Sequence, residues 1–517
     1  MPNRNSDQLY QLIQSLEKAE KRNFKLYIKR NSAKDDLKII QIFDALDKMD
    51  EYDEKLLLKR LNTIEKPQLA NLKNHLYKQI LASLRLLKVT ENIDLQLNEL
   101  IDYARILYNK GLYLQSLKIL ERARELARSN HKFNFLTQVI SLEKKIQTLH
   151  ITRSLVDKSE ELANESLEVS THIYLVFRLS NLALQLYSWY VQNGHARNET
   201  DEQTVKQFFK DRLPANAEKF TEFYEKLYLY QSYCWYAFIR QDFLMYYRYS
   251  QKWVSLFEAE PNMITVECGH YIKGIHNLLN AHFDLRNFQQ FSLVLEKMES
   301  AAKIPFIEHN DNFRVQVFVY IYSAKINWHL MTGTFNEGLN LIPELEEKLE
   351  QNQQYLDKHR ILVFNYKIAM LHFGCGNFEK SIDYLLHIIH DSLDLRYDLQ
   401  CYARLLHLMA HYELGNTSII ESLIKSVYRF MAKMKNLTVV EEEIFRFLKN
   451  SFYSPSQPTK NDFTVFLKTI KNYEKSRFET RAFAYLDVIS WVESKVKGIS
   501  MGEVIFQKYQ KHKKRNY

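Results

Sequence analysis

The spacing of apolar residues along the chain is helical wherever the pattern is strong. From Phe378, apolar residues follow at positions +4, +7, +8 and +11, and the segment after Tyr113 repeats such spacing from Leu117 to Ala127. One face of a helix with 3.6 residues per turn has this pattern, whereas a half-buried strand alternates at every second residue. We therefore expect an all-α protein, in which Gly, Pro and Asn separate successive helices.

Changes in the pattern divide the chain into three predicted domains. Residues 1–90 hold four apolar helix patterns, which predict a small N-terminal helical bundle. Residues 94–450 have a helix–turn–helix rhythm, which predicts an array of helical hairpins. A loop with two prolines precedes residues 461–517, where two or three further helices are expected to cap the array, because terminal units must cover its exposed end.

Three turns in the predicted array share one six-residue signature. The segments that begin at Gly111, Gly333 and Gly376 each have an aromatic residue two positions later and a small residue five positions later. Glycine permits the positive φ with which a helix commonly ends. The aromatic side chain would pack between the paired helices, and the small residue would let the second helix approach the first.

This signature resembles the turn of the tetratricopeptide repeat (TPR) family, Gly-x-Tyr/Phe-x-x-Ala. Ala104 and Ala369 match the family's packing position seven residues before the glycine, whereas the third unit has Ile326 there. Looser versions at Asp242 and Asn287 lack the glycine. The resemblance implies a right-handed α-solenoid of stacked helical hairpins whose groove binds proteins or peptides. The turns lie 39 to 46 residues apart instead of the usual ~34, so we expect an irregular array with longer helices.

Composition excludes several other classes of protein. The chain has 11 Gly and 8 Pro among 517 residues, whereas the two together usually make up about 12%. A β-sandwich, a doubly wound α/β fold or a Gly-rich nucleotide-binding site would need more turn-forming residues. No apolar window is long enough to span a membrane, and the first residues do not resemble a secretory signal. Four dispersed cysteines without a CxxC motif favour free thiols, so we expect a cytoplasmic protein with no membrane partner.

Positive charge is concentrated at the two ends of the chain. Residues 1–90 carry 18 Lys/Arg against 12 Asp/Glu, a net charge of +6, and residues 507–517 carry five basic residues and no acid. Helical spacing places five basic residues of the first segment on one stripe. Such a stripe is usually a solvated face, but it could also bind nucleic acid or another anionic partner. The candidates for an anionic partner are Lys18, Lys21, Arg22, Lys25, Lys29, Lys511, Lys513, Lys514 and Arg515.

Aromatic residues are densest in residues 220–257, where 15 of 38 residues are Phe, Tyr or Trp. One apolar helix face would use about half of them. The others would either pack against neighbouring helices or be exposed for binding, as Tyr and Trp are in many interfaces. The candidates for partner binding are Tyr228, Trp235, Tyr246 and Tyr249.

Candidate catalytic and metal-binding residues do not form a complete set. His407 and His411 share a helix face, as in zinc proteases, but the position after the first histidine is Leu408 instead of the glutamate base. Cys268 and His270 are two residues apart on a predicted helix and would not face each other. We therefore predict no catalytic residue, cofactor or metal.

Two functional hypotheses follow from the sequence. The first is a non-enzymatic scaffold or regulator that binds a protein or peptide in the groove of the TPR-like array. The alternative is nucleic-acid or ribonucleoprotein binding through the basic N-terminal bundle and the C-terminal tail. The identity of the partner and the oligomeric state do not follow from the sequence.

Overall fold

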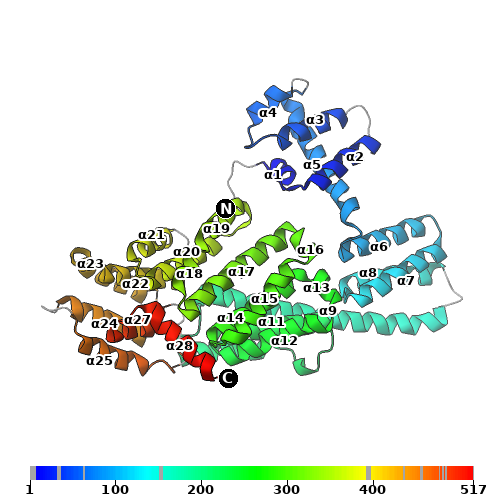
Figure 1. Cartoon of the computed structure of the whole chain (residues 1–517). Coiled ribbons are helices and arrows are strands. Elements are labelled where there is room, and N and C mark those ends of the chain that lie inside the picture. Colours follow the sequence, from blue (N-terminus) through cyan, green and yellow to red (C-terminus); the bar gives the residue numbers. More distant parts are fainter. Residues whose placement is uncertain are drawn as a thin grey trace. The chain divides into compact units, whose positions relative to one another are not determined.

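The fold was obtained as a computed structural model (Figure 1). It describes residues 7–31, 36–61, 64–150, 155–391, 397–434, 437–453, 458–476, 478–479, 483 and 486–515. Every regular element within these ranges is a helix, so the all-α prediction is confirmed. None of the described helices is long and apolar enough to cross a membrane.

The chain divides into two compact units, Met1–Ser170 (unit 1) and Thr171–Tyr517 (unit 2). The boundary lies inside the long helix α9 (Leu155–Asn193). It also lies inside the stretch 94–450 that the sequence pattern assigns to one array. The first hairpins after the bundle therefore belong to unit 1, and the later ones to unit 2.

In its described ranges, unit 1 begins with five helices that pack into a small bundle. Its helices are α1 (Gln8–Ser15), α2 (Lys18–Asn31), α3 (Asp36–Asp47), α4 (Glu54–Arg60) and α5 (Lys66–Lys88). Their apolar faces meet in one core that includes Phe24, Phe43 and Ile80. The basic stretch forms its own helix, α2, because Phe24 and Ile28 lie four residues apart and bury a narrow face while its cations stay outside.

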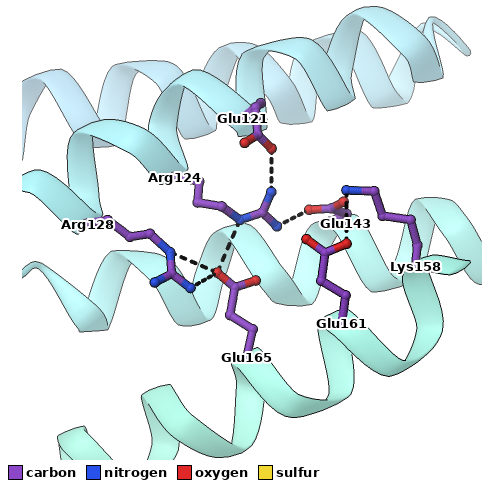
Figure 2. A network of polar contacts seen from close by, with 7 residues as sticks. All are labelled: Glu121, Arg124, Arg128, Glu143, Lys158, Glu161 and Glu165. Carbon is purple, nitrogen blue, oxygen red and sulfur yellow. Dashed lines mark hydrogen bonds and ion pairs between the residues drawn. The ribbon is translucent and has the colours of Figure 1, made fainter.

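The rest of unit 1 contains α6 (Ile93–Asn109), α7 (Tyr113–Ser129), α8 (Phe133–His150) and the first part of α9. A network of ion pairs around the buried Arg124 joins α7, α8 and α9 (Figure 2). Arg124 pairs with Glu121, Glu143 and Glu165, and Arg128 also binds Glu165, with 2.6 Å between Nη2 and Oε1. Burial alone would lower the pKa of Arg124, but Glu143 and Glu165 raise it overall. The guanidinium therefore stays charged inside this interface.

Unit 2 consists mainly of helical hairpins in which consecutive helices pack together, namely α11 with α12, α14 with α15, α20 with α21, and α22 with α23. Its helices are α10 (Glu199–Arg212), α11 (Phe223–Ile239), α12 (Phe243–Ala259), α13 (Asn262–Val266), α14 (Cys268–Asp284), α15 (Phe288–Ala302), α16 (Pro305–Glu308), α17 (Asp311–Thr332), α18 (Phe335–Leu339), α19 (Ile342–Gln351), α20 (Lys358–Gly374), α21 (Phe378–Ile389), α22 (Tyr397–Glu413), α23 (Thr417–Lys433), α24 (Val439–Tyr453), α25 (Lys460–Lys471), α27 (Val488–Lys497) and α28 (Met501–Arg515), with short 3₁₀ helices η1 (Ala217–Lys219) and η2 (Gln353–Tyr355).

One turn geometry recurs in these hairpins, with and without glycine. At the α20–α21 turn, Gly376 has φ 81° and the N–H of Asn377 donates to the carbonyl of His372, five residues back, at 2.9 Å. The turns at Asp242 and Asn287 have the same hydrogen bond, and the residues before them, Gln241 and Arg286, adopt φ of 56° and 53°. The looser units of the sequence therefore make the same turn at the cost of a left-handed non-glycine residue.

The small residue of the signature closes the hairpin in the way the sequence predicts. Ser381 on α21 is fully buried and donates a hydrogen bond to the carbonyl of Ala369 on α20 at 2.9 Å. In unit 1, Ser116 on α7 donates to the carbonyl of Ala104 on α6 at 2.8 Å. Hydroxyl and methyl groups of this size allow the two helices to approach closely, and the serine satisfies its own hydroxyl in doing so.

The C-terminal helix packs on the middle of unit 2. α28 lies against α17, several hairpins before the last one. Tyr509 of α28 packs against Phe288 and Trp328, with ring centroids 4.8 and 6.1 Å apart. The predicted capping segment therefore includes one helix that covers the edge of earlier hairpins.

Candidate functional site

A polar pocket of about 550 Å³ lies among the first helices of consecutive hairpins in unit 2. Gln231 of α11, Lys273 of α14, Gln316 of α17 and Arg360 of α20 all line it. Residues at the amino-terminal ends of α14 and α17 also line it, as does Asp357, the N-cap residue of α20. Amino-terminal ends of helices carry partial positive charge, so α14 and α17 favour an anion here, whereas the carboxylate of Asp357 already caps α20.

Helical spacing sets the polar groups of the pocket in register. On α17, Gln316, Tyr320, Ser323 and Asn327 are separated by four, three and four residues and so form one stripe. Arg360 and Lys367 are seven residues apart on α20, two turns along the same face. Polar side chains of α17 and α20 therefore face one another. Gln316 and Arg360 line the pocket, and a polar layer behind it contains Tyr320, Ser323, Asn327 and Lys367.

Tyr320 lies at the centre of this layer. Its ring stacks on His276 of α14, with centroids 3.8 Å apart and an interplanar angle of 10°. Lys273 Nζ lies 5.5 Å and Arg360 Cζ 5.9 Å from the centroid of the tyrosine ring. Gln316 Nε2 donates to the Tyr320 hydroxyl at 3.4 Å. The aromatic pair thus holds a lysine from one hairpin and an arginine from another beside the same ring.

Lys367 lies behind the pocket lining, and its ammonium group has no acidic partner in the part of the chain that the structure describes. Its ammonium nitrogen contacts the Ser323 hydroxyl at 2.5 Å and Asn327 Oδ1 at 2.8 Å. Burial lowers the pKa of Lys367 to about 7. Among the described residues, neither this lysine nor Lys273 or Arg360 forms an ion pair with a carboxylate.

The cations of the pocket change the titration of the aromatic pair. Burial alone would raise the pKa of Tyr320, but Lys273, Gln316 and Arg360 lower it overall. Burial lowers the pKa of His276 far below its ordinary value, and Lys273, Lys367 and Arg360 add to this effect. His276 is therefore neutral at pH 7, and the positive charge of the site comes mainly from Lys273 and Arg360, because Lys367 is only partly protonated at that pH.

Two acidic residues also line the pocket, and both are hydrogen-bonded within the protein. Glu267 accepts a hydrogen bond from the Tyr224 hydroxyl at 2.5 Å and lies 3.2 Å from His270 Nδ1. Asp357 accepts from the backbone N–H of His359 at 3.4 Å as the cap of α20. The two acids accept hydrogen bonds from donors of their own, whereas Lys273 and Arg360 form no ion pair with an acid of the described ranges.

The four predicted partner-binding aromatics lie partly or fully inside unit 2. Tyr246 is 5% exposed and belongs to the core, so it is not a surface contact residue. Trp235 packs against Tyr187, with ring centroids 4.8 Å apart, and Tyr249 stacks on Tyr233, with ring centroids 4.0 Å apart. The dense aromatics thus mainly fill space between long helices.

Tyr228 is the member of this set nearest to the pocket. Its ring packs edge-on against His270, which lines the pocket, with centroids 5.8 Å apart.

The predicted basic stripe on α2 is partly neutralised. Lys21 pairs with Asp47 and Lys25 with Asp44 of α3, each at 2.6 Å. Three further members of the stripe are exposed, without ion pairs among the described residues: Lys18, Arg22 and Lys29. In the tail, Lys511, Lys513 and Lys514 are exposed on α28, and the side chain of Arg515 lies outside the described residues.

The residues considered for catalysis are held in packing environments. His407 and His411 contact each other, with ring centroids 4.5 Å apart, and burial lowers the pKa of His407 to about 4. Burial raises the pKa of Cys268 to about 12, so its thiol stays protonated at pH 7. The described part of the chain has no group of three or more His, Cys, Asp or Glu side chains arranged to hold a metal ion.

Sequence reasoning missed Lys273, Tyr320, Arg360 and Lys367, which come together only in the fold. One signal was available, because Lys367 is the only Lys, Arg, Asp or Glu in residues 361–378. A single lysine in such a run is costly to bury and so marks a polar site or a pocket.

A comparison with protein-family models finds none that matches the chain, and a comparison with curated proteins finds no match.

Proposed function

We propose that the protein is a non-enzymatic scaffold or regulator that binds an acidic peptide segment of a protein partner. In this proposal the hairpins of unit 2 form a TPR-like, right-handed solenoid, and the pocket is part of its groove. The recurring turn and the serine–alanine closure of the hairpins support this arrangement.

The observation that carries the proposal is the pocket that successive hairpins build together. Its lining cations, Lys273 and Arg360, are not paired with carboxylates among the described residues, and Lys367 lies behind them. Gln231, Asn312 and Gln316 add amide groups that can donate to and accept from a peptide backbone. A shared polar surface of this kind suits an extended chain that crosses several helices.

Selection from a random peptide library on the full-length protein tests the proposal. We expect acidic peptides to be enriched, and the charge-reversed pair Lys273→Glu with Arg360→Glu to lose them. The matched control reverses the charges of Arg248 and Lys303, two exposed residues that do not line the pocket. Enrichment without acidic residues, or equal capture by the pocket variant, would overturn the proposal.

A second candidate, nucleic-acid binding, is favoured by the exposed cations of α2 and α28. Replacing the exposed cations of both helices by Gln, namely Lys18, Arg22, Lys29, Lys511, Lys513 and Lys514, should then weaken binding to DNA or RNA and make the slope of log K against log salt shallower. An unchanged slope would remove this candidate.

A further inference from the structure

The strongest unassigned feature of the pocket is its pair of cations, Lys273 and Arg360, neither of which forms an ion pair with a carboxylate among the described residues. We infer that Lys273, Arg360 and Gln316 form a subsite for a phosphomonoester, the phosphorylated side chain of the bound peptide. This inference rests on the proposed function and names the group that the pocket recognises.

Charge matching favours a dianion over a single carboxylate. A phosphomonoester carries about −1.5 to −2 charges at pH 7 and has three terminal oxygens. Lys273 and Arg360 together supply two positive charges, without a carboxylate partner among the described residues. A single carboxylate would pair directly with only one of them, whereas a phosphomonoester has enough terminal oxygens to contact both.

Donor geometry points the same way. The planar guanidinium of Arg360 can bind two oxygens of a phosphoryl group, and the ammonium of Lys273 can bind the third. Both cations lie beside the ring of Tyr320, on opposite neighbouring helices of α17. The side-chain amide of Gln316, which also lines the pocket, adds a neutral donor from α17 itself. Three helices thus direct donors toward one region.

The groups behind the subsite are a neutral histidine and a lysine, and neither is an acid. His276 is neutral and stacks on Tyr320, and Lys367, which lies beside Ser323 and Asn327, is partly protonated at pH 7 because burial lowers its pKa to about 7. Interactions between charges are stronger in such partly buried surroundings than in bulk water. The two acids of the lining, Glu267 and Asp357, accept hydrogen bonds from their own donors.

The size of the pocket favours a phosphorylated side chain over free phosphate. A volume of about 550 Å³ is far larger than a phosphate ion needs. The remaining lining includes Gln231 and Asn312, whose amides can bind the backbone on either side of a modified residue.

Calorimetric titration of the full-length protein tests this inference with one selected peptide in three forms, carrying Ser, Glu or phosphoserine at one position. Inorganic phosphate, sulfate and O-phosphoserine are titrated in parallel. We expect the phosphoserine peptide to bind at least tenfold more tightly than the Glu form and than inorganic phosphate. Arg360→Gln and Lys273→Met should each remove most of this preference, whereas Arg248→Gln with Lys303→Met should retain it.

Other outcomes separate this inference from the proposed function. Equal affinity for the Glu and phosphoserine forms would overturn the phosphomonoester subsite and leave acidic-peptide binding intact. If inorganic phosphate bound as tightly as the phosphopeptide, the subsite would be a site for a free anion. That result would overturn the inference that it binds a phosphorylated side chain of a peptide. Failure of every peptide form to bind would overturn the proposed function itself. Circular dichroism of each variant checks that it is folded.

Discussion

Gly333 lies directly against Gly502, so the turn after α17 meets the first turn of α28 backbone to backbone. A Cβ added to Gly333 would collide with the carbonyl oxygen of Gly502, and one added to Gly502 would come within 2.9 Å of the carbonyl oxygen of Gly333. No side chain fits between these segments. The position of α28 on the edge of the hairpins therefore depends on two glycines that are 169 residues apart in the sequence.

Replacing Gly333 by Ala should weaken the docking of α28. Gly376→Ala is a matched control, because Gly376 also has a positive φ, 81° against 78°, and open space at its Cβ position. The control should cost about 1–2 kcal/mol, from the left-handed backbone alone. Gly333→Ala should cost clearly more and should increase hydrogen exchange in α28. Equal losses of unfolding free energy in the two variants would show that the contact does not hold the helix.

Arg124 is the centre of the ion network in unit 1, and Arg124→Met should destabilise that unit. The change leaves the buried carboxylate of Glu143 without its cation, and breaking a buried pair costs about 3–5 kcal/mol. Arg128→Met is the control, because the Arg128 side chain is 45% exposed and pairs only at the edge. The control should cost at most about 1 kcal/mol.

Urea denaturation, combined with hydrogen exchange of α7 and α8, measures both effects. Similar losses in the two variants would contradict a central role for Arg124.

Features that depend on the local sequence could be predicted. They include the helical secondary structure and the close packing of the two helices of a hairpin at the small residue after the turn. Ser381 and Ala369 lie twelve residues apart, and the intervening turn determines that they meet. The turns at Asp242 and Asn287 match the six-residue signature only loosely. The residues before them, Gln241 and Arg286, have a positive φ, and a positive φ in a non-glycine residue has no dependable sequence signal.

The candidate site depends on side chains that are distant in the sequence, so the sequence did not reveal it. Lys273 and Arg360 are 87 residues apart, and their approach depends on how three hairpins stack. For the cations of α2, by contrast, the sequence predicts more free positive charge than the fold leaves. Their helical stripe is real, but the pairing of Lys21 and Lys25 with acids of α3 requires the tertiary fold.

Lys367→Met should change the pH dependence of stability above pH 7. Burial lowers the pKa of Lys367 to about 7 in the folded protein, against an ordinary value of 10.5. Between these values the unfolded chain binds a proton that the folded chain does not, so this lysine makes stability rise with pH in that window. The methionine variant lacks this contribution.

Its unfolding free energy relative to wild type should therefore fall steadily from pH 7 to pH 10 in urea titrations. A difference that stays constant with pH would contradict the lowered pKa.

His282→Leu should protect unit 2 against acid. His282 is 1% exposed, Nδ1 of its ring has no hydrogen-bond partner among the described residues, and burial lowers its pKa to about 4. As the pH falls from 6.5 to 4, the unfolded chain takes up a proton that the folded chain excludes, so the wild type loses stability in that range. The leucine variant should lose less over the same range, whereas His309→Leu, a change at an exposed histidine, should follow the wild type. Thermal unfolding at half-unit pH steps measures this, and parallel curves for wild type and His282→Leu would show that the histidine is not excluded from protonation.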